Sequence, residues 1–155
     1  MHHHGYLWTG PKERFDNEAL RRPPHHEPPP AGGRPELLQR YREVMAEFPT
    51  TNIPPLETAY WLVKPRSLVR GTWQEAKEAT AWLREHLAAY APRFTPASDH
   101  DVPNFMRLVN SATERLSSGG DVSLGFYLER PSYLSLAVVA CSPNRSKPGL
   151  VCPVR

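Results

Sequence analysis

A chain of 155 residues is long enough for one domain with a hydrophobic core, but short for two. The formal charge of +3 belongs to the ends, because residues 1–34 carry five bases and four acids, residues 141–155 carry three bases and no acid, and the part between is close to neutral. This charge balance argues against general attraction to nucleic acid. No apolar run approaches the roughly 20 residues of a membrane span, so we expect a cytoplasmic protein with reduced thiols and no membrane association.

Residues 1–34 are expected to form a flexible arm. The chain holds 18 prolines, well above the average share of about 5%, and residues 21–33 combine prolines and glycines without hydrophobic periodicity. Such a segment cannot offset its own ordering entropy by burying apolar surface. The aromatic head of the arm, which includes Tyr6 and Trp8, predicts a docking segment that lies on the body or on a partner.

Hydrophobic periodicity predicts three helices. Residues 35–48 carry one apolar stripe, with a proline at the first position and another directly after the end. A second helix is predicted over residues 72–90, because Thr72 and Glu75 match a T-x-x-E capping box ahead of a stripe at steps of three and four. A third helix is predicted over residues 102–116, and two glycines follow it.

Three segments have the composition of β-strands. Residues 58–63 (TAYWLV) are rich in aromatic and aliphatic side chains, and residues 122–128 alternate between apolar and more polar positions. Residues 134–141 are almost continuously apolar, which is typical of a strand in the middle of a sheet. A hairpin turn at residues 130–132 is expected to join the last two strands.

These elements predict an α+β fold in two layers, in the order α-β-α-α-β-β. We expect a small, mainly antiparallel, three-stranded sheet, with 134–141 as its central strand and three helices on one side. The domain organisation that follows is a Pro- and His-rich flexible arm at 1–34, a single α+β domain at 35–142, and a basic C-terminal tail at 143–155.

One base-rich loop in the body is a candidate anion-binding site. Residues 64–70 carry three bases and no acid, and they precede the predicted start of the second helix, where anions bind readily. A phosphate or carboxylate contact would use Lys64, Arg66, Arg70 and Thr72. The alternative is a solvated loop whose bases balance nearby glutamates.

Most reactive side chains lie at the two ends of the chain, which raises the possibility of a site split between the termini. His2, His3 and His4 can bind metal ions adventitiously, and His25 and His26 lie in the Pro-rich arm, where a fixed tetrahedral site is not expected. Cys141 and Cys152 have ten residues between them and lack the C-x₂-C spacing of common zinc sites. Buried free thiols are the favoured interpretation of this pair, ahead of a disulfide and of metal ligands, so no metal site and no cofactor are expected.

The same order of elements also occurs in winged-helix DNA-binding domains. That interpretation would make 102–116 the recognition helix, with Arg107 on its outer face and Arg130 in the wing. The long connection between the second and third predicted helices and the near-neutral body disfavour it. His100 lies between two aspartates, but adjacent loop residues rarely form a catalytic set and the aspartates suit helix capping.

No convergent catalytic residues are visible, so the sequence predicts a non-catalytic protein-interaction or regulatory module. Its partner would be another protein or a second copy of itself, as a homodimer, contacted through Tyr6, Trp8, Trp61 and Tyr127, since exposed Trp and Tyr often anchor interfaces. Alternatives are the winged-helix-like DNA-binding regulator, and a small enzyme or anion-binding protein that uses the 64–70 loop. The excess of Arg over Lys favours a bacterial source.

Overall fold

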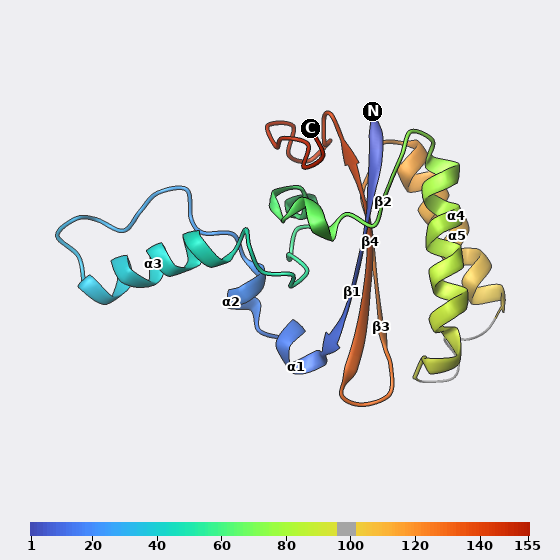
Figure 1. Cartoon of the computed structure of the whole chain (residues 1–155), viewed down its shortest axis with the longest axis horizontal. Coiled ribbons are helices and arrows are strands. Elements are labelled where there is room, and N and C mark those ends of the chain that lie inside the picture. The colour runs from blue at the N-terminus through green and yellow to red at the C-terminus, as the bar shows by residue number, and fades with distance from the viewer. Residues whose placement is uncertain (96–101) are drawn as a thin grey trace.

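The fold is α+β, as predicted, and it is built on one antiparallel sheet (Figure 1). A computed structural model describes residues 1–95 and 102–155. The prediction of a three-stranded sheet is wrong, because the sheet has four strands in the order β2-β1-β4-β3. They are β1 (His2–Pro11), β2 (Gly71–Trp73), β3 (Val122–Tyr127) and β4 (Ser132–Cys141).

The three predicted helices are present, and shorter helices accompany them. The α-helices are α1 (Lys12–Phe15), α2 (Glu18–Arg21), α3 (Pro35–Glu47), α4 (Ala76–Tyr90) and α5 (Val102–Ser117). The 3₁₀ helices are η1 (Thr58–Val63), η2 (Arg66–Leu68) and η3 (Ala91–Arg93). His100 and its flanking aspartates lie outside the described residues.

The predicted capping box of the second helix is displaced by one turn. The N-cap of α4 is Glu75, whose backbone N–H points at the carboxylate of Glu78 at 3.5 Å. Thr72 instead belongs to β2, because pairing with β1 holds residues 71–73 in an extended conformation. Competition from a strand partner therefore decided where α4 begins.

The predicted flexible arm is wrong for residues 2–11, which form β1 inside the sheet. This strand pairs antiparallel with β4 along its whole length, from His2 opposite Cys141 to Pro11 opposite Ser132. Both faces of β1 are covered, so its sequence lacks the alternation of apolar and polar residues that marks a half-exposed strand. Residues 22–34, by contrast, contain no helix or strand.

The strand predicted over residues 58–63 is also wrong, since this segment is the 3₁₀ helix η1. Ala59, Trp61 and Leu62 are its buried residues. A short apolar run is compatible with a strand or with one buried helical turn, and its periodicity does not separate the two. The interior position predicted for 134–141 is confirmed, but its neighbours are β1 and β3.

The sheet separates two hydrophobic cores. One face is covered by α4 and α5, and its buried residues include Leu83, Leu87, Leu116, Leu134, Leu136 and Val138. The opposite face is covered by η1 and the C-terminal segment, and its buried residues include Tyr6, Trp8, Ile53, Trp61, Val139, Cys141 and Cys152. Both chain termini lie at the same end of the sheet (Figure 1).

The expectation of three helices on one side of the sheet is wrong for α3, which projects away from this body, as Figure 1 shows. It contains no buried residue, and Leu37 and Met45 are 55% and 48% exposed. Among the described residues, no helix is long and apolar enough to cross a membrane.

Candidate metal centre

Two histidines and two cysteines from both ends of the chain meet on the face of the sheet opposite α4 and α5. His2 and His4 are two residues apart on β1, and side chains at this spacing point to the same face of a strand. Cys141 pairs directly with His2 across β1 and β4, so its side chain lies on that face too. The sheet register alone therefore brings three of the four side chains together.

The fourth side chain, Cys152, comes from the C-terminal segment that folds back over this face. The segment is not a free basic tail, because Asn144 is fully buried and anchors its start through hydrogen bonds to Asp121 and to the carbonyl of Ala140. Further along, Lys147 forms an ion pair of 3.2 Å with Glu57. These contacts hold Cys152 over β1, where it is 6% exposed.

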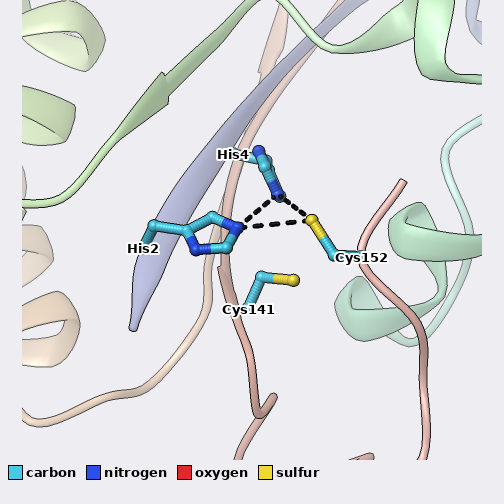
Figure 2. A group of neighbouring side chains, drawn as sticks. All are labelled: His2, His4, Cys141 and Cys152. Atoms are coloured by element: carbon cyan, nitrogen blue, oxygen red, sulfur yellow. Dashed lines mark hydrogen bonds between the residues drawn. The ribbon is translucent and has the colours of Figure 1, made fainter. Parts of the chain in front are cut away.

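The four side chains converge on one space, as Figure 2 shows. The Nε2 atoms of His2 and His4 are 3.1 Å apart, and each lies 3.4 Å from Sγ of Cys152. All four ligand atoms, including Sγ of Cys141, lie within 4.8 Å of one another. A tetrahedral zinc ion with ordinary Zn–N and Zn–S bonds separates its ligand atoms by about 3.3–3.8 Å. The observed spacing therefore fits one metal ion with two nitrogen and two sulfur ligands.

The protonation state of His4 suits a metal ligand. Its Nδ1 is 2.8 Å from Oγ1 of Thr72 on β2, so an Nδ1–H donated to this hydroxyl leaves the lone pair of Nε2 facing the other three ligand atoms. Burial, together with the neighbouring imidazoles of His2 and His3, lowers the pKa of His4 to about 4. The ring is therefore neutral at physiological pH.

The Cys141 thiol, by contrast, must lose its proton to bind a metal ion. Burial raises its pKa, so without a cation this thiol stays protonated at neutral pH. A divalent metal reverses this balance, because a coordinated thiol is deprotonated. The cluster thus has the donor atoms of a metal site, and a bound divalent ion would supply the positive charge that stabilises thiolates.

A nucleophilic cysteine–histidine pair is the main chemical alternative for this cluster. Cys152 and His4 are at hydrogen-bond distance, but a catalytic pair of this kind relies on an imidazolium next to a thiolate. The low pKa of His4 opposes that charge, and a second imidazole and a second thiol crowd the same sulfur. Metal ligation accounts for all four residues, whereas a catalytic pair accounts for two.

The site communicates with solvent on one side. A surface hollow of about 480 Å³ is lined by Met1, His2, Thr72, Gln74, Cys152, Val154 and Arg155. Through it an ion or small molecule reaches His2 and Cys152, while Cys141 and His4 are fully buried behind them.

The four residues predicted to bind an anion do not share one surface. Lys64 is 3% exposed, and its ammonium donates to the carbonyl of Phe48 at 2.5 Å and to Oγ1 of Thr51 at 3.0 Å. Thr72 faces His4 in the cluster of His2, His4, Cys141 and Cys152. Arg66 and Arg70 remain exposed on the loop, so the contact predicted there rests on these two arginines.

Three of the four aromatic residues predicted to contact a partner belong to the chain's own core. Tyr6, Trp8 and Trp61 are at most 5% exposed, and the rings of Tyr6 and Trp61 stack with centroids 4.6 Å apart. Tyr127 is 53% exposed on β3. The aromatic content that suggested an interface is largely needed to fill the second core.

Comparison with protein-family models, with curated proteins and with solved structures found no match for this chain. The candidate metal centre is therefore recognised by its geometry. Its sequence signal is an H-x-H pair and a C-x₁₀-C pair separated by most of the chain, and neither pair alone has the spacing of a common zinc motif.

Proposed function

We propose that this chain is a zinc-binding protein in which the metal is structural and the protein itself is non-catalytic. The observation that carries the proposal is the convergence of His2, His4, Cys141 and Cys152 within 4.8 Å. Sites with two sulfur and two nitrogen ligands in tetrahedral geometry are typical of zinc. Four protein ligands also fill the coordination shell, whereas catalytic zinc keeps one position open for water or substrate.

A single ion explains the spacing better than a two-iron cluster does. In a cluster with two histidine and two cysteine ligands, the histidines bind one iron and the cysteines the other. Both imidazole nitrogens here lie 3.4 Å from the same sulfur, that of Cys152. A single metal ion bound to this sulfur could therefore also bind both imidazole nitrogens.

The role of the metal follows from where its ligands lie in the chain. His2 and His4 belong to the first strand, Cys141 ends the last strand, and Cys152 lies near the C-terminus. A bound ion would therefore cross-link both ends of the chain to the interior strand β4. Metal binding of this kind contributes directly to the free energy of folding.

The decisive experiment measures zinc in the reduced, full-length protein. We expect one tightly bound zinc per chain by elemental analysis, and Co²⁺ in its place should show the visible absorption of a tetrahedral site with thiolate ligands. Cys152→Ser should weaken zinc binding at least tenfold in competition with a chromophoric chelator. His26→Ala is the matched control, because His26 is exposed in the Pro-rich segment away from the cluster.

Zinc that is absent from the reduced protein, or that binds equally well to Cys152→Ser, would remove the proposal. Binding that is lost in His26→Ala but kept in Cys152→Ser would assign the metal to the Pro-rich segment instead.

Self-association is the second candidate function, and α3 is the feature that favours it. The apolar stripe of this helix is unburied, with Leu37 and Met45 about half exposed. A second copy of the chain is the proposed occupant, since α3 carries both acids and bases and two copies therefore bring no block of like charge together. The dimer should be visible in sedimentation equilibrium and should dissociate in Leu37→Glu; a monomer at all concentrations would remove it.

The other two alternatives gain little support from the described residues. Arg107 is exposed on α5, but the near-neutral charge of the body still disfavours DNA binding. Of the four residues predicted to bind an anion, Arg66 and Arg70 remain available for such a contact. Both alternatives stay predictions from the sequence.

A further inference from the structure

We infer that Cys141 and Cys152 have two mutually exclusive bonding states: zinc-bound thiolates in the reduced protein, and a disulfide after reaction with a peroxide. The inference rests on the proposed zinc centre and adds an oxidative modification site to it. It also connects two alternatives that the sequence leaves open for this pair, a disulfide and metal ligation.

The two sulfurs are already neighbours. Both cysteines are unbonded, both are buried, and their Sγ atoms belong to the set that lies within 4.8 Å. The chain contains two cysteines in all, so each is the other's intramolecular partner. The bond would close the loop of residues 142–151.

The C-terminal segment can bring the sulfurs together without disturbing the sheet. Cys141 is fixed at the end of β4, whereas Cys152 follows β4 in a stretch without helix or strand. The anchors of that stretch, at Asn144 and Lys147, lie several residues before Cys152. A shift of Cys152 toward Cys141 therefore leaves the strand pairing unchanged.

A peroxide has a route to the outer sulfur. The surface hollow beside the site is lined by Cys152, His2 and Arg155. Cys141 is fully buried while Cys152 retains 6% exposure, so Cys152 is the sulfur that meets an incoming oxidant first. The buried Cys141 thiolate then stands behind it as the resolving group.

The reaction balances with hydrogen peroxide as the oxidant. The Cys152 thiolate attacks one peroxide oxygen and breaks the O–O bond, which gives a sulfenic acid and hydroxide. The Cys141 thiolate then attacks the sulfenic sulfur and expels a second hydroxide, forming the S–S bond. Two protons from solvent convert the hydroxides to water, and the two sulfurs together supply the two electrons.

Zinc leaves as a consequence, because the site then offers two imidazoles and no thiolate. The disulfide meanwhile keeps the C-terminal segment attached to the end of β4. One cross-link thus replaces another, and oxidation releases the metal while the fold is retained.

The test treats the zinc-loaded, full-length protein with hydrogen peroxide and follows zinc and sulfur together. Released zinc is read with a chromophoric chelator, and the protein mass is read in parallel. We expect one zinc released for each chain that becomes lighter by two hydrogen atoms, with restored zinc binding after reduction. Trypsin should give a cross-linked pair of peptides, 116–145 and 146–155, because the Arg130–Pro131 and Lys147–Pro148 bonds resist cleavage.

Two variants sharpen the result. His2→Ala keeps both thiols but removes one metal ligand, so the disulfide should form faster than in the wild type at equal peroxide. Cys141→Ser should lose the cross-linked peptide and accumulate higher oxidation products at Cys152.

Zinc loss with sulfinic or sulfonic acids and no cross-link would overturn the inference, as would a zinc-loaded protein that resists millimolar peroxide. A reduced protein that binds no zinc at all is a different outcome, because it would overturn the proposed function, and the inference with it, before any oxidant is added.

Discussion

Thr72 supports the candidate centre without being a ligand. Its hydroxyl oxygen lies 2.8 Å from Nδ1 of His4, where it can accept an Nδ1–H and orient the ring so that Nε2 faces the other three ligand atoms. Hydrogen bonds of this kind to metal-bound histidines affect metal affinity strongly. Pairing of β2 with β1 is what places Thr72 opposite His4.

Thr72→Val should therefore weaken zinc binding while it keeps the fold. Valine preserves the β-branched shape but offers no acceptor, so we expect the dissociation constant for zinc to rise about 10- to 100-fold. Chelator competition measures this change. Thr113→Val is the control, because Thr113 donates to a carbonyl within α5, which covers the opposite face of the sheet. An equal loss of zinc affinity in both variants would contradict the role given to Thr72.

Lys64 is a second buried polar residue with a structural role. Its ammonium lies 4.1 Å from the centre of the Phe48 ring and donates to the Phe48 carbonyl, just beyond the end of α3. Burial lowers the pKa of Lys64 to about 8. The folded protein therefore loses this proton at a lower pH than the unfolded chain, in which the pKa is near 10.5.

This difference predicts a pH dependence of stability. Between about pH 8 and pH 10.5 the unfolded state binds more protons at Lys64 than the folded state, so the contribution of this residue to the free energy of unfolding rises with pH across that window. The stability of the wild type minus that of Lys64→Met should increase over this range in urea titrations. Lys77→Met, which removes a lysine charge at an exposed position of α4, is the matched control. A difference between wild type and Lys64→Met that does not change with pH would contradict the lowered pKa of Lys64.

At the scale of elements, the C-terminal segment depends on Asn144. The side-chain amide donates to both carboxylate oxygens of Asp121 at 3.0 Å and to the Ala140 carbonyl at 2.8 Å. Its carbonyl oxygen accepts the backbone N–H groups of Ser146 and Lys147 at 3.0 Å. One buried side chain thus connects β4, the start of β3 and the turn that directs the chain back toward β1.

Asn144→Ala should destabilise the protein by about 3 kcal/mol, because several buried groups lose their partners at once. The same change should also weaken zinc binding, since it loosens the segment that carries Cys152. Urea unfolding and chelator competition test the two effects. Ser146→Ala removes only the hydroxyl contact to Asn144 and should cost less than about 1 kcal/mol; similar losses in both variants would argue against Asn144 as the anchor.

Strand β1 depends on its neighbours for space as well as for hydrogen bonds. At Gly5 an added Cβ would lie 2.8 Å from the Trp73 ring and 3.1 Å from Trp82. These two indoles close over β1 on the face opposite the His2, His4, Cys141 and Cys152 cluster, so glycine is needed where they approach the backbone. The strand is thus enclosed by tertiary packing on both faces.

For the whole molecule, the proposed metal would join segments that are far apart in sequence but adjacent at one end of the sheet (Figure 1). The Cys152–His4 contact spans 148 positions of the chain. A metal that binds the folded chain and not the unfolded one stabilises this long-range pairing, which is otherwise slow to form.

Chelation should consequently lower the melting temperature. Free zinc at about 100 times its dissociation constant stabilises a protein by about 2.7 kcal/mol if the unfolded chain does not bind it, which corresponds to a shift of about 5–10 °C at this chain length. Scanning calorimetry of the reduced protein with zinc and with a chelator measures the shift. The double variant Cys141→Ser/Cys152→Ser should show no difference between the two conditions, and a shift that persists in it would place the metal elsewhere.

Local sequence patterns predicted the helices and strands whose hydrophobic periodicity can be read from neighbouring residues. The stripe of residues 35–48, the stripe that ends at Tyr90, and the alternation over residues 122–128 all correspond to observed helices or strands, because 3.6- and 2-residue periods follow from backbone geometry. The hairpin of β3 and β4 was likewise predicted from neighbouring segments. The α+β class follows from these elements.

What the sequence by itself could not determine is the placement of residues 2–11 and of Cys152. Histidines and a glycine have weak strand preference, and β1 exists because β4, β2 and two covering layers supply its hydrogen bonds and its burial. The proposed metal-ligand set depends on that pairing, since the strand register sets His2 beside Cys141 and the anchored C-terminal segment adds Cys152. The sequence shows that the reactive side chains lie toward both ends of the chain. Only tertiary contacts, whose energy depends on residues distant in the sequence, bring those ends together.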